Sequence, residues 1–172
     1  MSLRNMLGQG WLALLAGLIF LISQGLIASI LHEGNASSLL FQFQFTYDAA
    51  SFSELLAHIS DDQLAALQAH FHYDHIHPLW YGLLIMSLTA WLLKVNQLPA
   101  RWDLLIILGA VPSVMDVIEN SLHEPVFMGI TAASQPAIAL AGACATTKWL
   151  LAALYSLFAI VLAVRATKNR PS

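Results

Sequence analysis

Four polar side chains share one face of an apolar segment in the second half of the chain. Their spacing is i, i+3, i+4 and i+7, as on one side of a helix, and they are Asp116, Glu119, Asn120 and His123. Ionisable groups inside a membrane helix must face protein or water, and they commonly mark functional sites. Two carboxylates whose pKa values diverge in a dry site can act as acid and base. Asp116 and Glu119 are therefore candidate catalytic residues, and Asn120 is a candidate for orienting a substrate.

Lys148 supplies a positive charge in the next apolar segment. At about 1.5 Å per helical residue, Asp116 lies about 10 Å below His123, and Lys148 lies about 18 Å below Pro136. Side chains lean toward the N-terminus of their helix, so Lys148 reaches outward while Asp116 leans inward. This arrangement predicts an Asp116–Lys148 ion pair, with Glu119 as the alternative partner. Lys148 is also a candidate catalytic residue that would stabilise negative charge.

Further polar residues fall at a similar depth in two other apolar segments. Asp74, His77 and Tyr81 share a helical face if a helix begins near Tyr73, and Gln24 interrupts the first apolar run. We expect these four side chains to contribute to substrate binding. The alternative is that the polar residues only hold helices together, with each bond contributing about 0.6–2 kcal/mol.

A histidine-rich stretch precedes the second apolar run. On a helix, His70, Asp74 and His77 would share a face and offer ligands that zinc accepts. The spacing matches no standard zinc motif, so we expect no cofactor, with zinc as the alternative. Cys144 is the only cysteine, so neither an intrachain disulfide nor a cysteine-based metal site is expected.

The composition is that of a membrane protein. Hydrophobic residues make up 58% of the 172 residues and charged residues 10%, whereas soluble domains carry about 25% charged residues. A helix needs about 20 apolar residues to cross the hydrocarbon core. The runs that meet this length approximately are 11–31, 76–93, 104–122 and 137–164. We therefore expect one all-α membrane domain over residues 1–172, a four-transmembrane-helix bundle; without a basic tract, no nucleic-acid partner is expected.

Basic residues indicate how the bundle is oriented. Lysine and arginine are absent from residues 32–75 and 121–136, and they occur before the first run, between the second and third, and after the fourth. The positive-inside rule therefore predicts that both termini are cytoplasmic. A cleaved signal peptide is the alternative for the first run, but that run exceeds the usual h-region of roughly 7–15 residues.

Residues 32–75 form the predicted external segment. Aromatic residues alternate with polar ones from Phe41 to Tyr47, a pattern typical of an extended segment. Ser51 with Glu54, and Ser60 with Gln63, have the spacing of capping boxes. The helix after Ser60 places Leu64, Leu67 and Phe71 on one face. We expect an external amphipathic helix on the membrane surface, either as a lid or as a simple connector.

Three short motifs resemble a family of small four-helix bacterial membrane proteins of unassigned activity. They are Asp74 with Pro78 and Tyr81, Asp116-x-x-Glu119-Asn120, and Lys148-Trp149. The likeness covers roughly residues 60–165. The family pattern has threonine three residues before the lysine, where this chain has Ala145. The resemblance implies a bundle with a shared polar site in a bacterial inner membrane, and it implies no particular reaction.

Three functions compete on these observations. The first is a site in the outer half of the membrane for a lipid or lipophilic small molecule, with or without enzymatic activity. The second is a proton or cation pathway, which also uses buried carboxylates. The third is an accessory subunit of a larger membrane complex, or a homo-oligomer, in which the polar residues pair completely. A cavity beside the polar residues would favour the first function, and a filled bundle would favour the third.

Overall fold

The computed structural model describes residues 2–168, and over that range it contains helices and no strand. Four helical stretches are long and apolar enough to cross a membrane. They are α2 (Gly10–Glu33), α6 (His77–Val95), the stretch Ala100–Phe127, and α9 (Gln135–Lys168). The prediction of an all-α protein with four membrane-spanning helices is thus confirmed at the level of helix length and composition.

The third spanning stretch is broken into pieces. It consists of the 3₁₀ turn η1 (Ala100–Asp103), α7 (Leu104–Leu108) and α8 (Val111–Phe127), where the sequence predicted one helix over 104–122. Pro112 stands at the start of α8. Because proline has no N–H to donate to the preceding turn, the helix is interrupted just before it. The break leaves α8 as a separate helix that carries the polar face.

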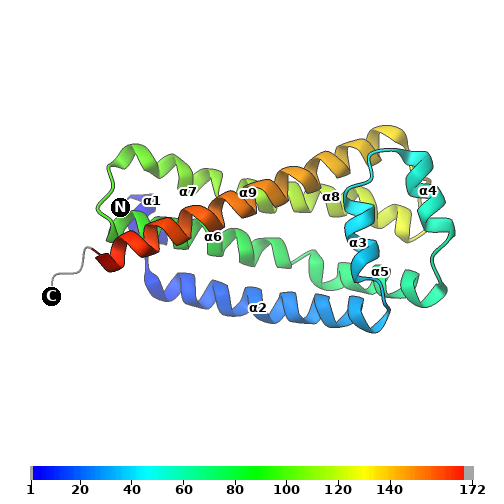
Figure 1. The fold of residues 1–172 in the computed structure, drawn as a ribbon, viewed down its shortest axis with the longest axis horizontal. Coiled ribbons are helices and arrows are strands. Elements are labelled where there is room, and N and C mark those ends of the chain that lie inside the picture. The colour runs from blue at the N-terminus through cyan, green and yellow to red at the C-terminus, as the bar shows by residue number, and fades with distance from the viewer. Residues whose placement is uncertain (1, 169–172) are drawn as a thin grey trace.

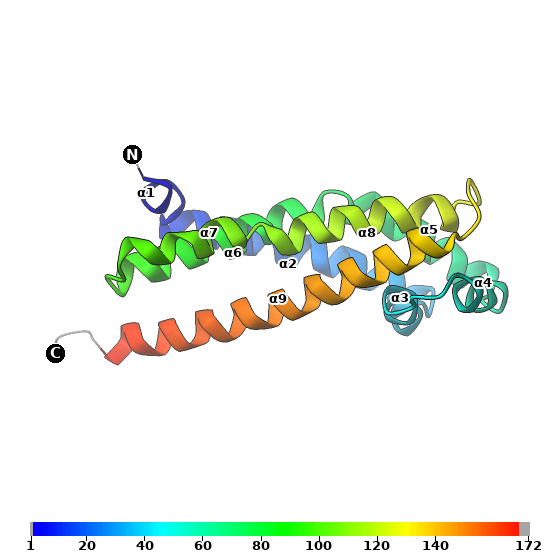
Figure 2. The same cartoon turned by 90° about the horizontal axis from the view of Figure 1, so that it is seen from above.

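The helices run side by side along the long axis of the molecule (Figure 1). Helix α2 packs on α6, and α8 packs on α9, while α6 contacts both α8 and α9. Figure 2 shows α9 close to α8 at one end of the bundle and diverging from α8 toward its C-terminal end, where Leu162 packs against the end of α6. Helices α2 and α9 are therefore opposite walls of the bundle, and α6 lies between them.

One end of the bundle is tied together by Arg4 of α1 (Leu3–Leu7). Its guanidinium pairs with Asp103 and donates to the carbonyl oxygen of Leu98, so it joins the first helix to the connection between α6 and η1. The end of α9 is held by Asn96, which donates to the carbonyl oxygen of Leu162 at 3.0 Å. This end also carries the start of α2 and the end of α6 (Figure 1).

The opposite end is built from three shorter helices, α3 (Ser37–Gln44), α4 (Ala49–Ala57) and α5 (Asp61–Asp74). The prediction of an extended segment over 41–47 was wrong, because most of it is helix α3. Residues Phe41 and Phe45 are i and i+4, so the alternating pattern also places them on one helical face. Burial decides between the two readings: Phe43 is fully buried, with ring centroids of Phe52 and Phe127 each 4.8 Å away.

The two predicted helix starts had different outcomes. The capping box at Ser60 is present. The Ser60 hydroxyl oxygen accepts from the Gln63 backbone N–H, and the Gln63 side-chain oxygen accepts from the Ser60 backbone N–H. The one at Ser51 was wrong, because α4 begins earlier with Asp48 as its cap. The Asp48 carboxylate accepts from the backbone N–H and the hydroxyl of Ser51, and these bonds lower the pKa of Asp48.

Helix α5 is present, and its apolar face packs on the bundle. Leu67 and Phe71 are buried in a cluster with residues of α2, α3, α4 and α8, and Leu64 is partly buried against it. The start of α5 lies at the end of α2, where Gln63 donates to the Asn35 carbonyl oxygen at 3.4 Å. Figure 1 shows α5 running beside α2 and leading into α6, rather than crossing the end of the bundle.

We predict that Gly82 is needed for the close approach of α6 to α8. A Cβ atom there would meet the Ser113 side chain at 2.6–2.9 Å, closer than real contacts allow. Gly82→Ala should lower stability by about 1–3 kcal/mol, as overpacking does, in thermal unfolding in detergent. The matched control is Gly25→Ala, where nothing lies within 4 Å; there a gain of about 0.5–1 kcal/mol is expected. Equal effects of the two substitutions would contradict this packing.

Candidate functional site

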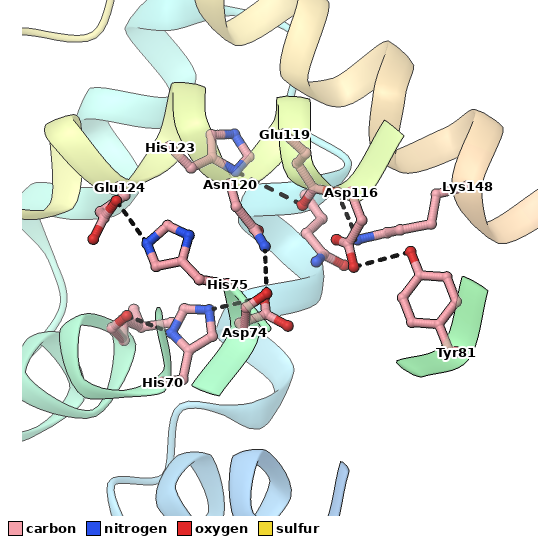
Figure 3. Close-up of polar contacts among 12 residues, drawn as sticks. His70, Asp74, His75, Tyr81, Asp116, Glu119, Asn120, His123, Glu124 and Lys148 are labelled. Carbon is pink, nitrogen blue, oxygen red and sulfur yellow. Dashed lines mark hydrogen bonds and ion pairs between the residues drawn. The ribbon is translucent and has the colours of Figure 1, made fainter. Parts of the chain in front are cut away.

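Lys148 lies between two carboxylates at the centre of the bundle. Its Nζ donates to Asp116 Oδ1 at 2.6 Å, and it lies 2.6 Å from Glu119 Oε2, within ion-pair distance but without the alignment of a hydrogen bond. Figure 3 shows Lys148 entering from α9 toward the face of α8 that carries both carboxylates. The predicted Asp116–Lys148 pair is confirmed, and the alternative partner Glu119 is engaged at the same time.

The local sequence makes this geometry possible. Asp116 and Glu119 are one helical turn apart, so one ammonium can reach both. On α9 the fully buried Ala141 and Ala145 precede Lys148 on the same stripe, and small residues let two helices approach closely. The three charged side chains are 9% exposed or less. A buried charge without a partner is very costly, so this ion triad fixes α8 against α9.

Tyr81 connects α6 to the same cluster. Its hydroxyl donates toward Asp116 Oδ2 at 3.0 Å and toward the Pro112 carbonyl oxygen at 2.9 Å. Both oxygens of Asp116 are therefore engaged, one by Lys148 and one by Tyr81. Asp116 thus joins α6, α8 and α9.

Asp74 is the last residue of α5 and stands beside this cluster. Asn120 donates to its backbone carbonyl oxygen at 3.2 Å, which joins α8 to α5. Burial, with the negative charge of Asp116 as the second cause, raises the pKa of Asp74 to about 7. His70 Nε2 lies 3.8 Å from Asp74 Oδ2, and burial lowers the pKa of His70 to about 4. At neutral pH the His70 ring is therefore neutral.

The predicted metal ligands are only partly brought together. His70 and Asp74 are neighbours, but His77 Nδ1 lies 2.8 Å from Ser23 Oγ of α2. Within residues 2–168, no group of three or more His, Cys, Asp or Glu side chains is arranged to hold a metal ion. The geometry gives the zinc hypothesis no support, and it stays an untested prediction. His123 lies 3.8 Å from Glu119, behind the ion triad.

A cavity of about 420 Å³ lies between α2 and α9, with α6 as its floor and α3 at one end. Many of its polar side chains gather around the cluster, namely Gln24, Gln44, Asp74, His77, Tyr81, Asp116 and Lys148. Four others are more scattered, with Ser37 on α3 and Thr89, Tyr155 and Ser156 farther along α6 and α9. Most of the remaining wall is apolar, and includes Phe20, Ile27, Leu31, Leu40, Leu84, Ile85, Leu88, Ala152 and Ala159. Of the predicted site residues, Glu119, Asn120 and His70 are not part of this wall. They lie behind the wall and contact residues that form it.

Two residues of the wall were not found from the sequence. Trp149 Nε1 donates to Gln44 Oε1 at 3.1 Å, so α9 and α3 are joined beside the cavity. The Phe41 ring lies 5.5 Å from the Trp149 ring between centroids. The sequence pattern does not indicate Gln44, because an extended segment over 41–47 lacks the helical turn that brings Gln44 to α9. The adjacency of Trp149 to Lys148 was the only available signal for Trp149.

Family models, curated proteins and solved structures were compared with this chain, and none of them matches it. The class that the geometry itself defines is a helical bundle with four apolar spanning helices and an ion triad beside a largely apolar cavity.

We predict that Lys148 and Asp116 are energetically coupled. Lys148→Met leaves both Asp116 and Glu119 without a counter-ion, so a loss of about 3–5 kcal/mol is expected. Asp116→Asn should cost less, because Lys148 keeps Glu119. In the double variant the second substitution removes one stranded charge, so the losses should be non-additive by about 0.5–3 kcal/mol. The measurement is a double-mutant cycle on thermal unfolding in detergent.

The control for this cycle is Lys94→Met, which removes an exposed lysine at the end of α6. A change of no more than about 0.5 kcal/mol is expected there. Strictly additive losses for Asp116 and Lys148 would show that the two side chains do not interact.

Proposed function

We propose that this chain is a multi-pass membrane protein that binds, or acts on, a lipid or lipophilic small molecule in the cavity between α2 and α9. The observation that carries this proposal is the position of the charged residues at the cavity wall. Asp74, Asp116 and Lys148 are buried from solvent, and all three are part of the cavity wall. The cavity volume of about 420 Å³ is within the usual range for small-molecule sites, roughly 300–1,000 Å³.

The wall suits a molecule with a polar head and an apolar tail. The charged groups gather where α5, α6, α8 and α9 meet. From there a mainly apolar wall continues along α6 and α9, interrupted by Thr89, Tyr155 and Ser156. From Lys148 to Ala159 the α9 wall extends over about 16 Å, at about 1.5 Å per residue. The apolar length of this wall favours a lipid-like ligand over a small polar substrate.

The accessory-subunit alternative fits less well. Residues that only join helices would be expected to pair with one another and leave no cavity between them. Glu119 and Asn120 behave in that way, but Asp74, His77 and Gln24 face the cavity. We assign binding to Asp74, His77, Tyr81 and Gln24. If the protein is an enzyme, Asp116 and Lys148 are the groups that could reach the bound molecule.

We further propose a bacterial inner membrane as the location, with both termini in the cytoplasm. The end of the bundle that carries α1, the start of η1 and the end of α9 holds the basic residues Arg4, Lys94, Arg101, Arg165 and Lys168. The opposite end, with α3 to α5, has acidic residues and no lysine or arginine between residues 32 and 75. The positive-inside rule supports a cytoplasmic position for the basic end. The amphipathic helix α5 would then belong to the external end.

This orientation predicts opposite labelling of two single cysteines. Cys144 is the only natural cysteine and is buried, so Cys144→Ala gives a clean background. In intact cells, a membrane-impermeant maleimide should label Glu54→Cys in α4 and leave Arg101→Cys in η1 unlabelled. After permeabilisation both should react. Labelling of Arg101→Cys alone in intact cells would show that the opposite orientation is correct.

The cavity predicts that one bulky side chain blocks ligand binding. Ala152 lines the cavity, whereas its neighbour Ala153 is exposed and does not. Ala152→Trp fills the space, so native mass spectrometry of the protein released from lipid should lose the retained ligand. Ala153→Trp adds the same side chain on another face and should keep it. A bound molecule that both variants retain lies outside the cavity.

A further inference from the structure

The polar end of the cavity carries more negative than positive charge. Asp74 and Asp116 line it, Glu119 lies behind the wall, and Lys148 is the ammonium that pairs with the last two. In the part of the chain that the structure describes, no lysine or arginine forms an ion pair with Asp74. The Asp74 carboxylate therefore faces the cavity without a cation beside it.

The neighbours of Asp74 relieve this charge only in part. His70 is within ion-pair distance at 3.8 Å, but burial lowers its pKa to about 4 and keeps it neutral. Asn120 donates to the backbone carbonyl oxygen of Asp74. The Asn120 amide and the charge of Lys148 lower the pKa of Asp74, but by less than burial and the charge of Asp116 raise it. Burial and the charge of Asp116 raise the pKa of Asp74 to about 7, which is what an uncompensated carboxylate in a dry site is expected to show. A cation from outside the protein would remove this penalty.

Several hydrogen-bond donors of the wall are already used inside the protein. The single proton of the Tyr81 hydroxyl is shared between Asp116 Oδ2 and the Pro112 carbonyl oxygen, and the Trp149 ring N–H donates to Gln44. The Lys148 ammonium donates to Asp116 and lies within ion-pair distance of Glu119. The amides of Gln24 and Gln44 carry further donors but no charge. A ligand therefore meets carboxylate acceptors more than donors.

His77 also lines the cavity. The Ser23 hydroxyl lies 3.0 Å from the Phe20 carbonyl oxygen and 2.8 Å from His77 Nδ1, and the donor in the second contact depends on the tautomer of His77. In either tautomer a neutral imidazole ring keeps one nitrogen as an acceptor.

An anionic head group does not suit this wall. A phosphate or carboxylate would bring negative charge next to Asp74 and Asp116, and the one ammonium is already shared by two carboxylates. Burying like charges together discriminates strongly against a ligand. A protonated amine supplies both the donors and the positive charge, and the aromatic rings of Tyr81 and Trp149 at the wall also favour a cation.

We propose that the cavity binds an amphiphile with a protonated amine head group, whose ammonium lies beside the Asp74 carboxylate and whose alkyl chain follows the apolar wall of α6 and α9. The proposal rests on the proposed function and names the class of ligand for that site. It also gives Asp74 the role of recognising charge, which is separate from the structural role of the Lys148 triad.

The test compares three probes that share one alkyl chain and differ in the head group: dodecylamine, dodecanol and dodecyl phosphate. Binding to the full-length protein in a non-ionic detergent is measured by native mass spectrometry above the pKa of Asp74. Dodecylamine should bind about tenfold or more tightly than dodecanol, because a charge-assisted hydrogen bond is worth about a factor of ten or more. Dodecyl phosphate should bind weakest.

Two variants locate the effect at the site. Asp74→Asn keeps the shape and removes the charge, so dodecylamine should lose about tenfold in affinity while dodecanol is unchanged. Glu54→Gln, an exposed carboxylate in α4, removes the same charge elsewhere and should change neither. A loss that Glu54→Gln reproduces would assign the preference to the overall protein charge and overturn the proposal.

The outcomes separate this proposal from the proposed function. If Ala152→Trp abolishes binding of all three probes but dodecyl phosphate or dodecanol binds as tightly as dodecylamine, the cavity stands and the amine preference is overturned. If no probe shows binding that Ala152→Trp removes, both proposals fail together. The ranking of probes on the wild-type protein decides the question even where Asp74→Asn does not fold.

Discussion

The buried ion triad of Lys148, Asp116 and Glu119 is the interaction on which the arrangement of the helices depends. Charges removed from water regain their energy only when partners are held at short distance, and here both contacts are 2.6 Å. That requirement fixes how far α9 can lie from α8 and at what depth. The small residues Ala141 and Ala145, both fully buried, allow the approach. The position of the triad is thus a packing constraint as well as an electrostatic one.

The same triad explains why a cavity exists. Tyr81 joins α6 to the triad through its hydrogen bond to Asp116. On the opposite side of α6, helix α2 packs on both α6 and α5. The C-terminal part of α9 diverges from α8 (Figure 2) and is joined to the end of α6 by Asn96. Helices α2 and α9 therefore face each other across α6, with α3 bridging one end through Gln44 and Trp149. The cavity is the space that this arrangement leaves beside the charged residues.

The long-range features could be predicted because they follow from strong physical constraints. Apolar length defines four spans, and a 3.6-residue period places Asp116 and Glu119 on one face. The lean of side chains along a helix was sufficient to bring Lys148 to the depth of Asp116. These inferences need no knowledge of how the short helices pack.

The features that sequence reasoning missed depend on tertiary burial. The alternation of Phe41, Phe43 and Phe45 fits a strand and also a helix, and only the burial of Phe43 among other aromatic rings decides for the helix. An extended segment over residues 41–47 does not place Gln44 beside Trp149, so the contact between them cannot be predicted without the helix. The placement of α5 against α2 was missed for the same reason, since its apolar face suits a membrane surface and a protein surface equally.

The charges of this site would be hard to explain by stability alone. Replacing a buried ion pair by well-packed apolar residues is often neutral or stabilising, so joining α8 to α9 does not require Asp116, Glu119 and Lys148. Asp74 adds a further carboxylate that pairs with no lysine or arginine among the described residues and is open to the cavity. An uncompensated carboxylate destabilises the empty protein and stabilises a complex with a cation. The excess charge is therefore better explained by what the cavity binds than by how the helices are held together.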